Sequence, residues 1–149
     1  MHKEKSILFL LGENESKIAM LYGLYAEKIR GRKKFWLTLE KEERGHGEVM
    51  MELDERCRGE CDFLKVNRHA RQIVGYVSEF INDEIRKAEM ERISHGEALA
   101  SALRLEQSMV ESKSFEIFEP VGGPVAAVFR RINRETKGHV RELRKMCRG

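Results

Sequence analysis

The chain has 149 residues, of which 36% are charged and 41% hydrophobic, with only 2 prolines and 7% aromatics. This composition predicts a single, largely helical domain over residues 1–149, because good helix formers are abundant and few residues break the chain. The net charge of +3 is too small to favour nucleic-acid binding. The apolar run SILFLLG is too short to cross a membrane and lacks the cleavage pattern of a signal peptide. We therefore expect a cytoplasmic protein.

Apolar residues spaced alternately by three and four positions predict helices in the first half of the chain. The first two helices cover about 5–30 and 33–57, and the intervening RGRKK is a short turn. Helices joined by so short a turn are antiparallel neighbours. After the irregular stretch at 58–65, the same spacing predicts a third helix at about 67–91.

The second half of the chain repeats the helix–turn–helix pattern. SHGE is a capping-box signature that begins a fourth helix over about 95–118. EPVGGP holds both prolines and marks the clearest break, and a fifth helix covers about 124–147. Residues 58–93 are then a crossover with an additional helix, which connects two hairpins.

Five ionisable residues lie in the apolar stripes of these helices, where core positions belong. They are Glu15, Glu43, His46, Glu106 and His139. A lone buried carboxylate is costly unless it is paired or bound to a metal. Three carboxylates that point into one core repel each other unless protons or cations compensate their charge. The stripes therefore predict a polar cluster inside the bundle.

The two hairpins are similar in sequence. Glu-Arg-Gly-His at 43–46 aligns with Thr-Lys-Gly-His at 136–139. Glu15 aligns with Glu106, and each glutamate precedes the histidine of its own hairpin by nearly the same number of residues. A duplicated hairpin with a long crossover makes a four-helix bundle. We therefore predict an all-α, four-helix bundle that is built from two similar hairpins.

The Glu-x-x-His pair places a carboxylate and an imidazole on one helix face, where both can reach the same metal ion. Two such pairs, with one glutamate from each remaining helix, form the dinuclear carboxylate sites of helical bundles. Iron suits the mixed oxygen and nitrogen ligands, as does manganese, and zinc is a third alternative. A complete site of this kind predicts a dinuclear iron centre.

Two pairs of segments carry a family resemblance. ENESKIAMLYGLYAEK with FWLTLEKEERGHGEVMMEL resembles the first hairpin of the rubrerythrin-like branch of the ferritin-like superfamily, and EALASALRLEQSMVESKSFEIF with INRETKGHVREL resembles the second. The resemblance implies non-haem diiron chemistry, either the reduction of peroxide or the use of oxygen. It also implies a ferritin-like bundle, which often forms a homodimer. The implied ligands are Glu15, Glu43, His46, Glu106 and His139.

Three features depart from that family pattern. Thr136 stands where the last helix should present a carboxylate, and the neighbouring Glu135 would replace it only if the helix rotated. Lys113 stands where the first hairpin has Tyr22, and it either pairs with the carboxylates or extends to the rim. No rubredoxin-like cysteine module is present in the sequence. Electrons would therefore come from a separate partner, such as a rubredoxin-like protein.

Several alternatives remain open at this level. Tyr22 or Tyr25 would donate a hydrogen bond or a proton at the site, or pack only as core aromatics. A non-catalytic bundle would hold one metal ion or none, and a helical interaction module would use the basic segment 130–148. Cys57 and Cys61 have the wrong spacing for a zinc ribbon. The methionines at helical spacing are expected in the core: Met20, Met50, Met51 and Met109.

Overall fold

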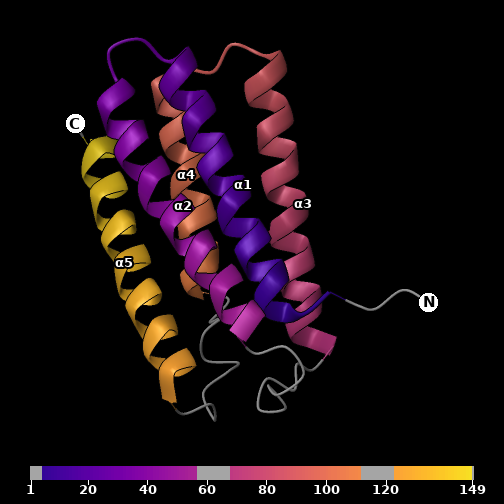
Figure 1. The fold of residues 1–149 in the computed structure, drawn as a ribbon. Helices are drawn as coiled ribbons and strands as arrows, with labels where there is room; N and C mark the ends of the chain where they lie inside the picture. The colour runs from indigo at the N-terminus through magenta and orange to yellow at the C-terminus, as the bar shows by residue number, and fades with distance from the viewer. Residues whose placement is uncertain (1–4, 57–67, 112–122, 149) are drawn as a thin grey trace.

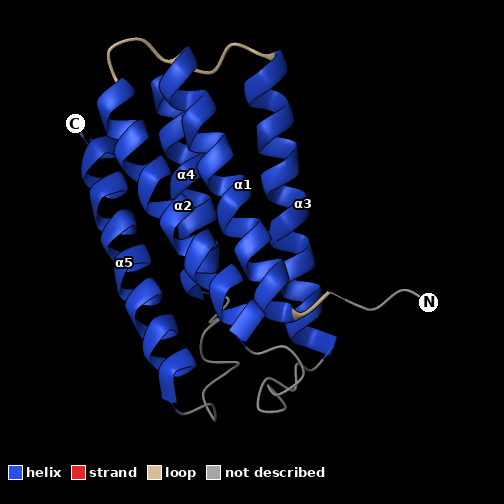
Figure 2. Cartoon of the chain, viewed as in Figure 1, coloured by secondary structure: helices blue, strands red, loops and turns tan. Residues whose placement is uncertain are grey.

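A computed structural model describes residues 5–56, 68–111 and 123–148 (Figure 1). The described part of the chain is all-α, as predicted, and contains no strand (Figure 2). Its helices are α1 (Ile7–Lys28), α2 (Lys33–Arg56), α3 (Arg68–Met90), α4 (His95–Glu111) and α5 (Gly123–Arg148). The predicted end of the fourth helix at 112–118, together with Lys113, Cys57 and Cys61, lies outside the described residues.

Local chemistry explains where the helices begin and turn. The Ser6 hydroxyl accepts a hydrogen bond of 3.0 Å from the Phe9 amide and so caps α1. The Ser94 hydroxyl accepts one of 3.1 Å from the Glu97 amide and caps α4, which confirms the predicted start of that helix. Gly31 has a φ of 78°, a left-handed conformation that suits glycine, and it reverses the chain between α1 and α2.

The order of directions follows from these turns. α1 and α2 are antiparallel, and α3 carries the chain back along the bundle, so that α4 runs in the same direction as α2 (Figure 1). α5 then returns antiparallel to α4. The two hairpins are therefore joined lengthwise through α3.

The first hairpin is packed through two glycines. A Cβ atom built on Gly47 would lie 2.7 Å from the Ser16 hydroxyl and 3.2 Å from the Gly12 carbonyl oxygen. A Cβ atom on Gly12 would lie 3.1 Å from the Met50 Cβ atom. A Cβ atom at either position would press on the facing helix and force small shifts, so these glycines allow α1 and α2 to approach closely at the middle of the bundle.

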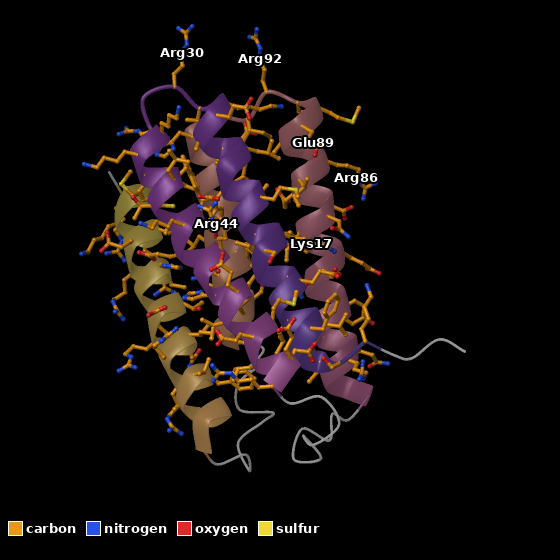
Figure 3. All side chains as sticks on the ribbon, viewed as in Figure 1. Lys17, Arg30, Arg44, Arg86, Glu89 and Arg92 are labelled. Atoms are coloured by element: carbon orange, nitrogen blue, oxygen red, sulfur yellow. The ribbon has the colours of Figure 1, made fainter. Side chains whose placement is uncertain are left out.

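α3 is attached to α1 by polar contacts along its length. The buried Asn14 side chain donates to the Val74 carbonyl at 3.2 Å, and Lys17 donates to the Ser78 hydroxyl at 3.1 Å. Figure 3 shows Lys17 on the side of α1 that faces α3, whereas Arg30 and Arg92 project from the connections at one end of the bundle. α3 therefore covers α1 from outside.

The apolar core has two parts, and the ionisable residues lie between them. One cluster includes Ile18, Trp36 and Leu143, and the other includes Leu11, Met50 and Ile132. Along α1, α2 and α5 the ionisable stripe positions fall between members of the two clusters. The polar residues therefore form one layer across the middle of the bundle, with hydrophobic packing on both sides.

The exposure of side chains bears on two expectations, the methionine core and the basic segment 130–148. Met20 is 56% exposed, so its prediction as a core residue was wrong, whereas Met50 and Met109 are buried. Met20 lies outside the buried stripe of α1. The cationic side chains of α5 are exposed: Arg130, Arg131, Arg134, Lys137, Arg141, Arg144, Lys145 and Arg148. Among the described helices, none is both long and apolar enough to cross a membrane.

Candidate metal centre

The five ionisable residues of the predicted cluster meet in the middle of the bundle. Their exposed fractions range from 0% for Glu43 and Glu106 to 5% for His139. α1 and α4 each supply one glutamate, α2 supplies a glutamate and a histidine, and α5 supplies a histidine. The structure thus brings together residues that are far apart in sequence, and it does so from all four helices of the two hairpins.

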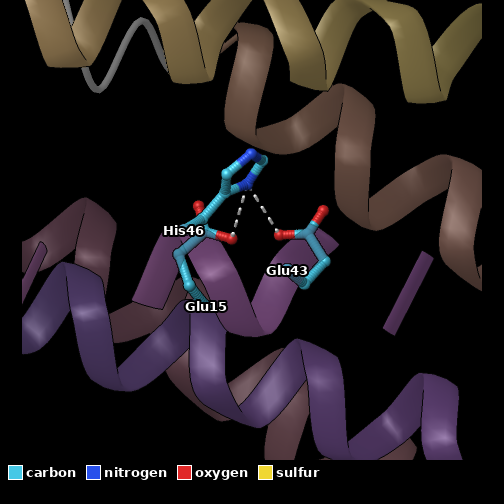
Figure 4. Close-up of side chains that lie close together, drawn as sticks. All are labelled: Glu15, Glu43 and His46. Atoms are coloured by element: carbon cyan, nitrogen blue, oxygen red, sulfur yellow. Dashed lines mark hydrogen bonds and ion pairs between the residues drawn. The ribbon is translucent and has the colours of Figure 1, made fainter. Parts of the chain in front are cut away.

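Glu15, Glu43 and His46 form the first group that can hold a metal ion, with one ligand atom from each within 4.8 Å of the others. The Nδ1 atom of His46 lies 3.4 Å from Glu43 Oε2 and 3.8 Å from Glu15 Oε2. Figure 4 shows the His46 ring above both carboxylates, which face the same nitrogen. α1 and α2 alone provide this group.

Glu43, Glu106 and His139 form the second group, again with one ligand atom from each within 4.8 Å of the others. The Nδ1 atom of His139 lies 3.0 Å from Glu43 Oε1 and 3.5 Å from Glu106 Oε1. The rings of His46 and His139 are stacked, with centroids 6.0 Å apart. Glu43 belongs to both groups, with one oxygen toward each histidine.

The outer nitrogen of each histidine contacts a glutamate of the other hairpin. His46 Nε2 lies 2.5 Å from Glu135 Oε2, and His139 Nε2 contacts Glu42 Oε2. Carboxylates in this position fix the tautomer and orientation of a ligating imidazole. The structure places Glu135, which the sequence offered as a substitute ligand, on this outer side. Sequence reasoning missed the equivalent role of Glu42, although its alignment with Glu135 was the available signal.

Thr136 is buried in the polar layer at the position aligned with Glu43. Its exposed fraction is 0%, and its hydroxyl donates a hydrogen bond of 2.8 Å to the Ile132 carbonyl of the same helix. The hydroxyl is thus satisfied within α5, and Thr136 brings no carboxylate to the cluster. The second hairpin therefore supplies one carboxylate, from Glu106, where the first supplies two.

Burial and proximity shift the protonation of the cluster. Burial alone would lower the pKa of His46, but Glu15 and Glu43 outweigh it and raise that pKa to about 11. The pKa of His139 is also raised, because Glu106 and Glu43 outweigh the lowering effect of burial and bring it to about 12. Burial and then the charges of Glu106 and Glu15 raise the pKa of Glu43 well above its ordinary value. Without a metal, both imidazoles therefore hold the positive charge that the carboxylates require.

The pKa of Glu15 shifts the other way. Burial would raise that pKa, but contacts with Glu43 and His46 outweigh burial and lower it. A buried carboxyl with a lowered pKa keeps its negative charge at neutral pH. Glu15 therefore keeps a negative charge that can bind a cation.

The donor set fits a metal pair in one further respect. Glu15 Oε2 and Glu106 Oε2 are buried, and neither has a hydrogen-bond partner among the described residues. A buried acceptor without a partner is costly, and native proteins rarely leave one without a reason. Glu15 and Glu106 hold aligned positions in the two hairpins, and each residue belongs to one of the two ligand groups. A metal ion in each group could therefore be bound by the carboxylate that carries the unsatisfied oxygen.

Tyr22 and Tyr25 differ in their relation to the cluster. The Tyr22 hydroxyl donates a hydrogen bond of 2.8 Å to Glu106 Oε1. Burial, then the charges of Glu106 and Glu43, raise the pKa of Tyr22 well above its ordinary value, so it remains a proton donor at neutral pH. The Tyr25 hydroxyl instead contacts Ser101. Of the two predicted tyrosines, Tyr22 is the one in contact with a potential ligand.

A cleft between α2 and α5 leads to the two histidines. His46, His139, Glu42 and Glu135 contribute to its lining, and Lys34 and Arg131 lie among its basic residues. Glu42 and Glu135 are about half exposed, whereas the imidazoles beneath them are buried. The outer side of the cluster is therefore the side that solvent and small molecules can approach.

Known proteins do not identify the chain: no protein-family model, curated protein or solved structure matches it. Its function is therefore argued from the geometry and chemistry of the buried cluster.

Proposed function

We propose that this chain is a ferritin-like protein of the rubrerythrin-like kind, and that Glu15, Glu43, His46, Glu106 and His139 hold two iron ions. The order of helix directions and the crossover through α3 support the ferritin-like assignment (Figure 1). The two ligand groups that share Glu43 support a dinuclear centre. A carboxylate with one oxygen toward each group has the position of a bridging ligand.

The observation that carries the proposal is a pair of buried carboxylate oxygens that accept no hydrogen bond from the described residues. Glu15 Oε2 and Glu106 Oε2 are buried without a hydrogen-bond partner among the described residues, and each belongs to a residue of a different ligand group. Hydrophobic packing alone explains neither, because an apolar side chain of similar size would remove the cost of burying a carboxylate. Oxygen and imidazole donors together favour iron or manganese, with zinc as a further candidate.

The activity we propose is that of a non-haem iron oxidoreductase or peroxidase that acts on peroxide or oxygen. Bound iron would supply electrons and stabilise developing negative charge at this site. The protein would supply access and a proton donor. The α2–α5 cleft admits a small substrate, and the Tyr22 hydroxyl donates a hydrogen bond of 2.8 Å to Glu106. Glu42 and Glu135 fix the orientation of the histidines.

The proposal extends to partners and location. The chain would act in the cytoplasm, would receive electrons from a separate donor such as a rubredoxin-like protein, and would form a homodimer. Binding of a metal at the cluster does not depend on any of these statements. They are tested separately, by reduction with candidate donors and by the mass of the protein in solution.

Metal analysis and iron titration test the central claim. Protein purified without chelators is analysed for metals, stripped, and titrated anaerobically with Fe(II) before exposure to air or peroxide. We expect two irons per chain and the absorption that iron gains on oxidation to the ferric state. Less than one bound metal per chain would contradict the proposal. Two bound metals without oxidant consumption would support the site and reject the activity.

A second candidate is a non-catalytic bundle that holds one ion, such as zinc, or none. The hydrogen bond between the Thr136 hydroxyl and the Ile132 carbonyl favours it, because α5 then supplies no carboxylate to the cluster. The raised pKa values of His46 and His139 also show how imidazolium groups can neutralise the carboxylates without a metal. The same titration separates the two candidates by the number of ions bound per chain.

A further inference from the structure

A row of aromatic rings extends from the metal-centre residues to the surface. The Tyr22 hydroxyl contacts Glu106 at 2.8 Å, and the Tyr22 ring lies 5.5 Å from the Trp36 ring between centroids. Trp36 Nε1 donates to His95 Nδ1 at 3.3 Å, and their ring centroids are 5.9 Å apart. Each side chain in the row therefore contacts the next one.

Both oxidisable members of this row are sealed from water. Tyr22 and Trp36 each have an exposed fraction of 0%. Tryptophan and tyrosine are the aromatic side chains that lose single electrons most readily, and rings in contact exchange electrons quickly. Burial keeps a transient radical away from solvent and from other molecules. Trp36 is the only tryptophan of the chain, so the row has a single central member.

Each oxidisable side chain also has a proton acceptor in hydrogen-bond contact. An indole or a phenol becomes a strong acid when it loses an electron, so oxidation is easiest where a base can take the proton. His95 Nδ1 serves the Trp36 indole, and Glu106 serves the Tyr22 hydroxyl. Tyr25 also packs on Trp36, at 4.9 Å, but its hydroxyl contacts Ser101. Tyr25 is therefore a branch of the row and does not touch a potential metal ligand.

The outer end of the row opens on the surface. A small pocket at that end of the bundle is lined by Arg32, His95, Gly96, Leu99, Lys145, Met146 and Cys147. His95 is partly buried there, and its Nε2 atom has no hydrogen-bond partner among the described residues. Burial and then the charge of Arg32 lower the pKa of His95, which keeps the ring neutral and able to accept the indole hydrogen.

We propose that Tyr22, Trp36 and His95 form a path for single electrons between the buried carboxylate–histidine cluster and the surface pocket at His95. Its biological use rests on the proposed function, because a redox-active metal ion at the cluster is the partner at the inner end. The partner at the outer end is a one-electron reductant.

The electron and proton transfers along this path balance. Tyr22 gives one electron to an oxidised metal ion and its phenolic proton to Glu106. Trp36 then gives one electron to Tyr22, which recovers its proton from Glu106, and the indole proton of Trp36 passes to His95. The reductant returns one electron to Trp36, which recovers its proton from His95. One electron has moved from the reductant to the metal ion, and each side chain is restored.

The test uses the full-length, metal-free chain with a photo-oxidant at the outer end. Cys147 is exposed and lines the pocket, so a ruthenium polypyridyl label is attached to it after Cys57→Ser and Cys61→Ser are introduced. Tyr76→Phe removes an exposed tyrosine that the label would oxidise directly. After a flash with a sacrificial acceptor, we expect a tryptophan radical followed by a tyrosine radical, by transient absorption and electron paramagnetic resonance.

Two variants identify the members of the path. Trp36→Phe should abolish the tyrosine radical, because phenylalanine keeps the ring contact but is not oxidised. Tyr22→Phe should leave a longer-lived tryptophan radical. Circular dichroism checks that both variants fold, and the loss of one hydroxyl makes Tyr22→Phe the milder change. An undiminished tyrosine radical in Trp36→Phe, or an unchanged radical lifetime in Tyr22→Phe, would overturn the proposal.

The position of the label provides the matched control. In a chain with Cys147→Ser and Arg56→Cys, the label is attached at exposed position 56 of the same helix as Trp36, and the helical rise puts it roughly 30 Å from Trp36. Trp36 oxidation should then be slower than from position 147, and equal rates would reject a path through His95. Because no metal is present, failure here leaves the iron titration unaffected, and failure to bind iron leaves this result interpretable.

Discussion

The two hairpins place histidines alike but differ in their carboxylates. In each hairpin a histidine directs Nδ1 into the cluster and Nε2 toward a glutamate of the other hairpin. At the aligned position before it, α2 has Glu43, which faces both histidines, and α5 has Thr136, whose hydroxyl is bonded within its own helix. The second ligand group therefore depends on a residue of the first hairpin. Removing Glu43 should weaken metal binding at both groups, whereas changing Thr136 should change the metal affinity of the second group relative to the first.

Glu43→Gln should have the largest effect. Loss of the shared carboxylate should weaken metal binding at both groups by more than about 100-fold, beyond the effect of removing an outer-shell partner. The metal-free protein should lose only about 1 kcal/mol, because the raised pKa of Glu43 shows that burial disfavours its charged form, and glutamine keeps the shape and hydrogen-bonding capacity of the side chain. Calorimetric metal titration and thermal unfolding measure the two quantities. Glu48→Gln, on the exposed face of α2, is the control. If Glu43→Gln still bound one metal ion tightly, the two ligand groups would not share Glu43.

Metal binding should strengthen as pH rises. The pKa values of His46 and His139 are raised to about 11 and about 12, so both imidazoles are protonated at neutral pH and must lose a proton to bind a metal. Displacing one proton for each ion increases the apparent affinity for that ion by up to about tenfold per pH unit, and the overall constant for two ions by up to about 100-fold. Titrations in buffers of different ionisation enthalpy count the protons released, and no release would contradict the prediction.

The same shifts predict the pH dependence of the metal-free protein, with the opposite sign. An unfolded histidine titrates near pH 6.5. The stability that each raised pKa contributes is therefore complete below about pH 6.5 and is lost as pH rises toward about 11 and about 12. The melting temperature of metal-free protein should fall over that alkaline range. A melting temperature that is constant there would show that the imidazoles are not charged in the folded state.

Thr136→Glu should make the second hairpin resemble the first. In the metal-free protein an additional buried carboxylate should cost roughly 3 kcal/mol, since it joins three others in one layer. With metal present, the second ion should bind at least about tenfold more tightly, the size of effect that even an outer-shell partner has. Thr136→Val is the control: it removes the hydroxyl, should cost about 1 kcal/mol, and should not change metal binding. An unchanged affinity for the second ion in Thr136→Glu would show that a carboxylate at position 136 does not reach the site.

Glu42→Gln and Glu135→Gln test whether the outer contacts are equivalent. Each residue holds the Nε2 atom of a histidine from the other hairpin, so each substitution should weaken metal binding by roughly tenfold. If Glu135 instead replaces the missing carboxylate of α5, Glu135→Gln should cost far more than Glu42→Gln. Paired titrations of the two variants decide between an orienting role and direct ligation.

The sequence predicted the helices and the inward residues, because the spacing of apolar residues reports which face of a helix is buried. Glu15, Glu43, His46, Glu106 and His139 all lie where their stripes placed them. The sequence did not predict that Glu42 would reach His139 across the bundle, because a contact between helices depends on their separation and rotation. The exposure of Met20 has the same origin, since a methionine at helical spacing fits either the core or the rim.

The hairpins also differ in how closely their helices pack, and this gives the smallest expected effect. Gly12 and Gly47 lie face to face between α1 and α2, whereas the aligned positions of the second hairpin are Leu103 and Val140. Gly47→Ala should destabilise the protein by about 1 kcal/mol, because overpacking outweighs the better helix propensity of alanine. Gly45→Ala is the control on the same helix: its Cβ atom would meet nothing within 4 Å, so it should stabilise by roughly 0.5–1 kcal/mol. Chemical denaturation of both variants measures the difference. If both Gly47→Ala and Gly45→Ala stabilise the protein, α1 and α2 can separate without cost. Metal binding through Glu15 and His46 would then not depend on the close approach of these two helices.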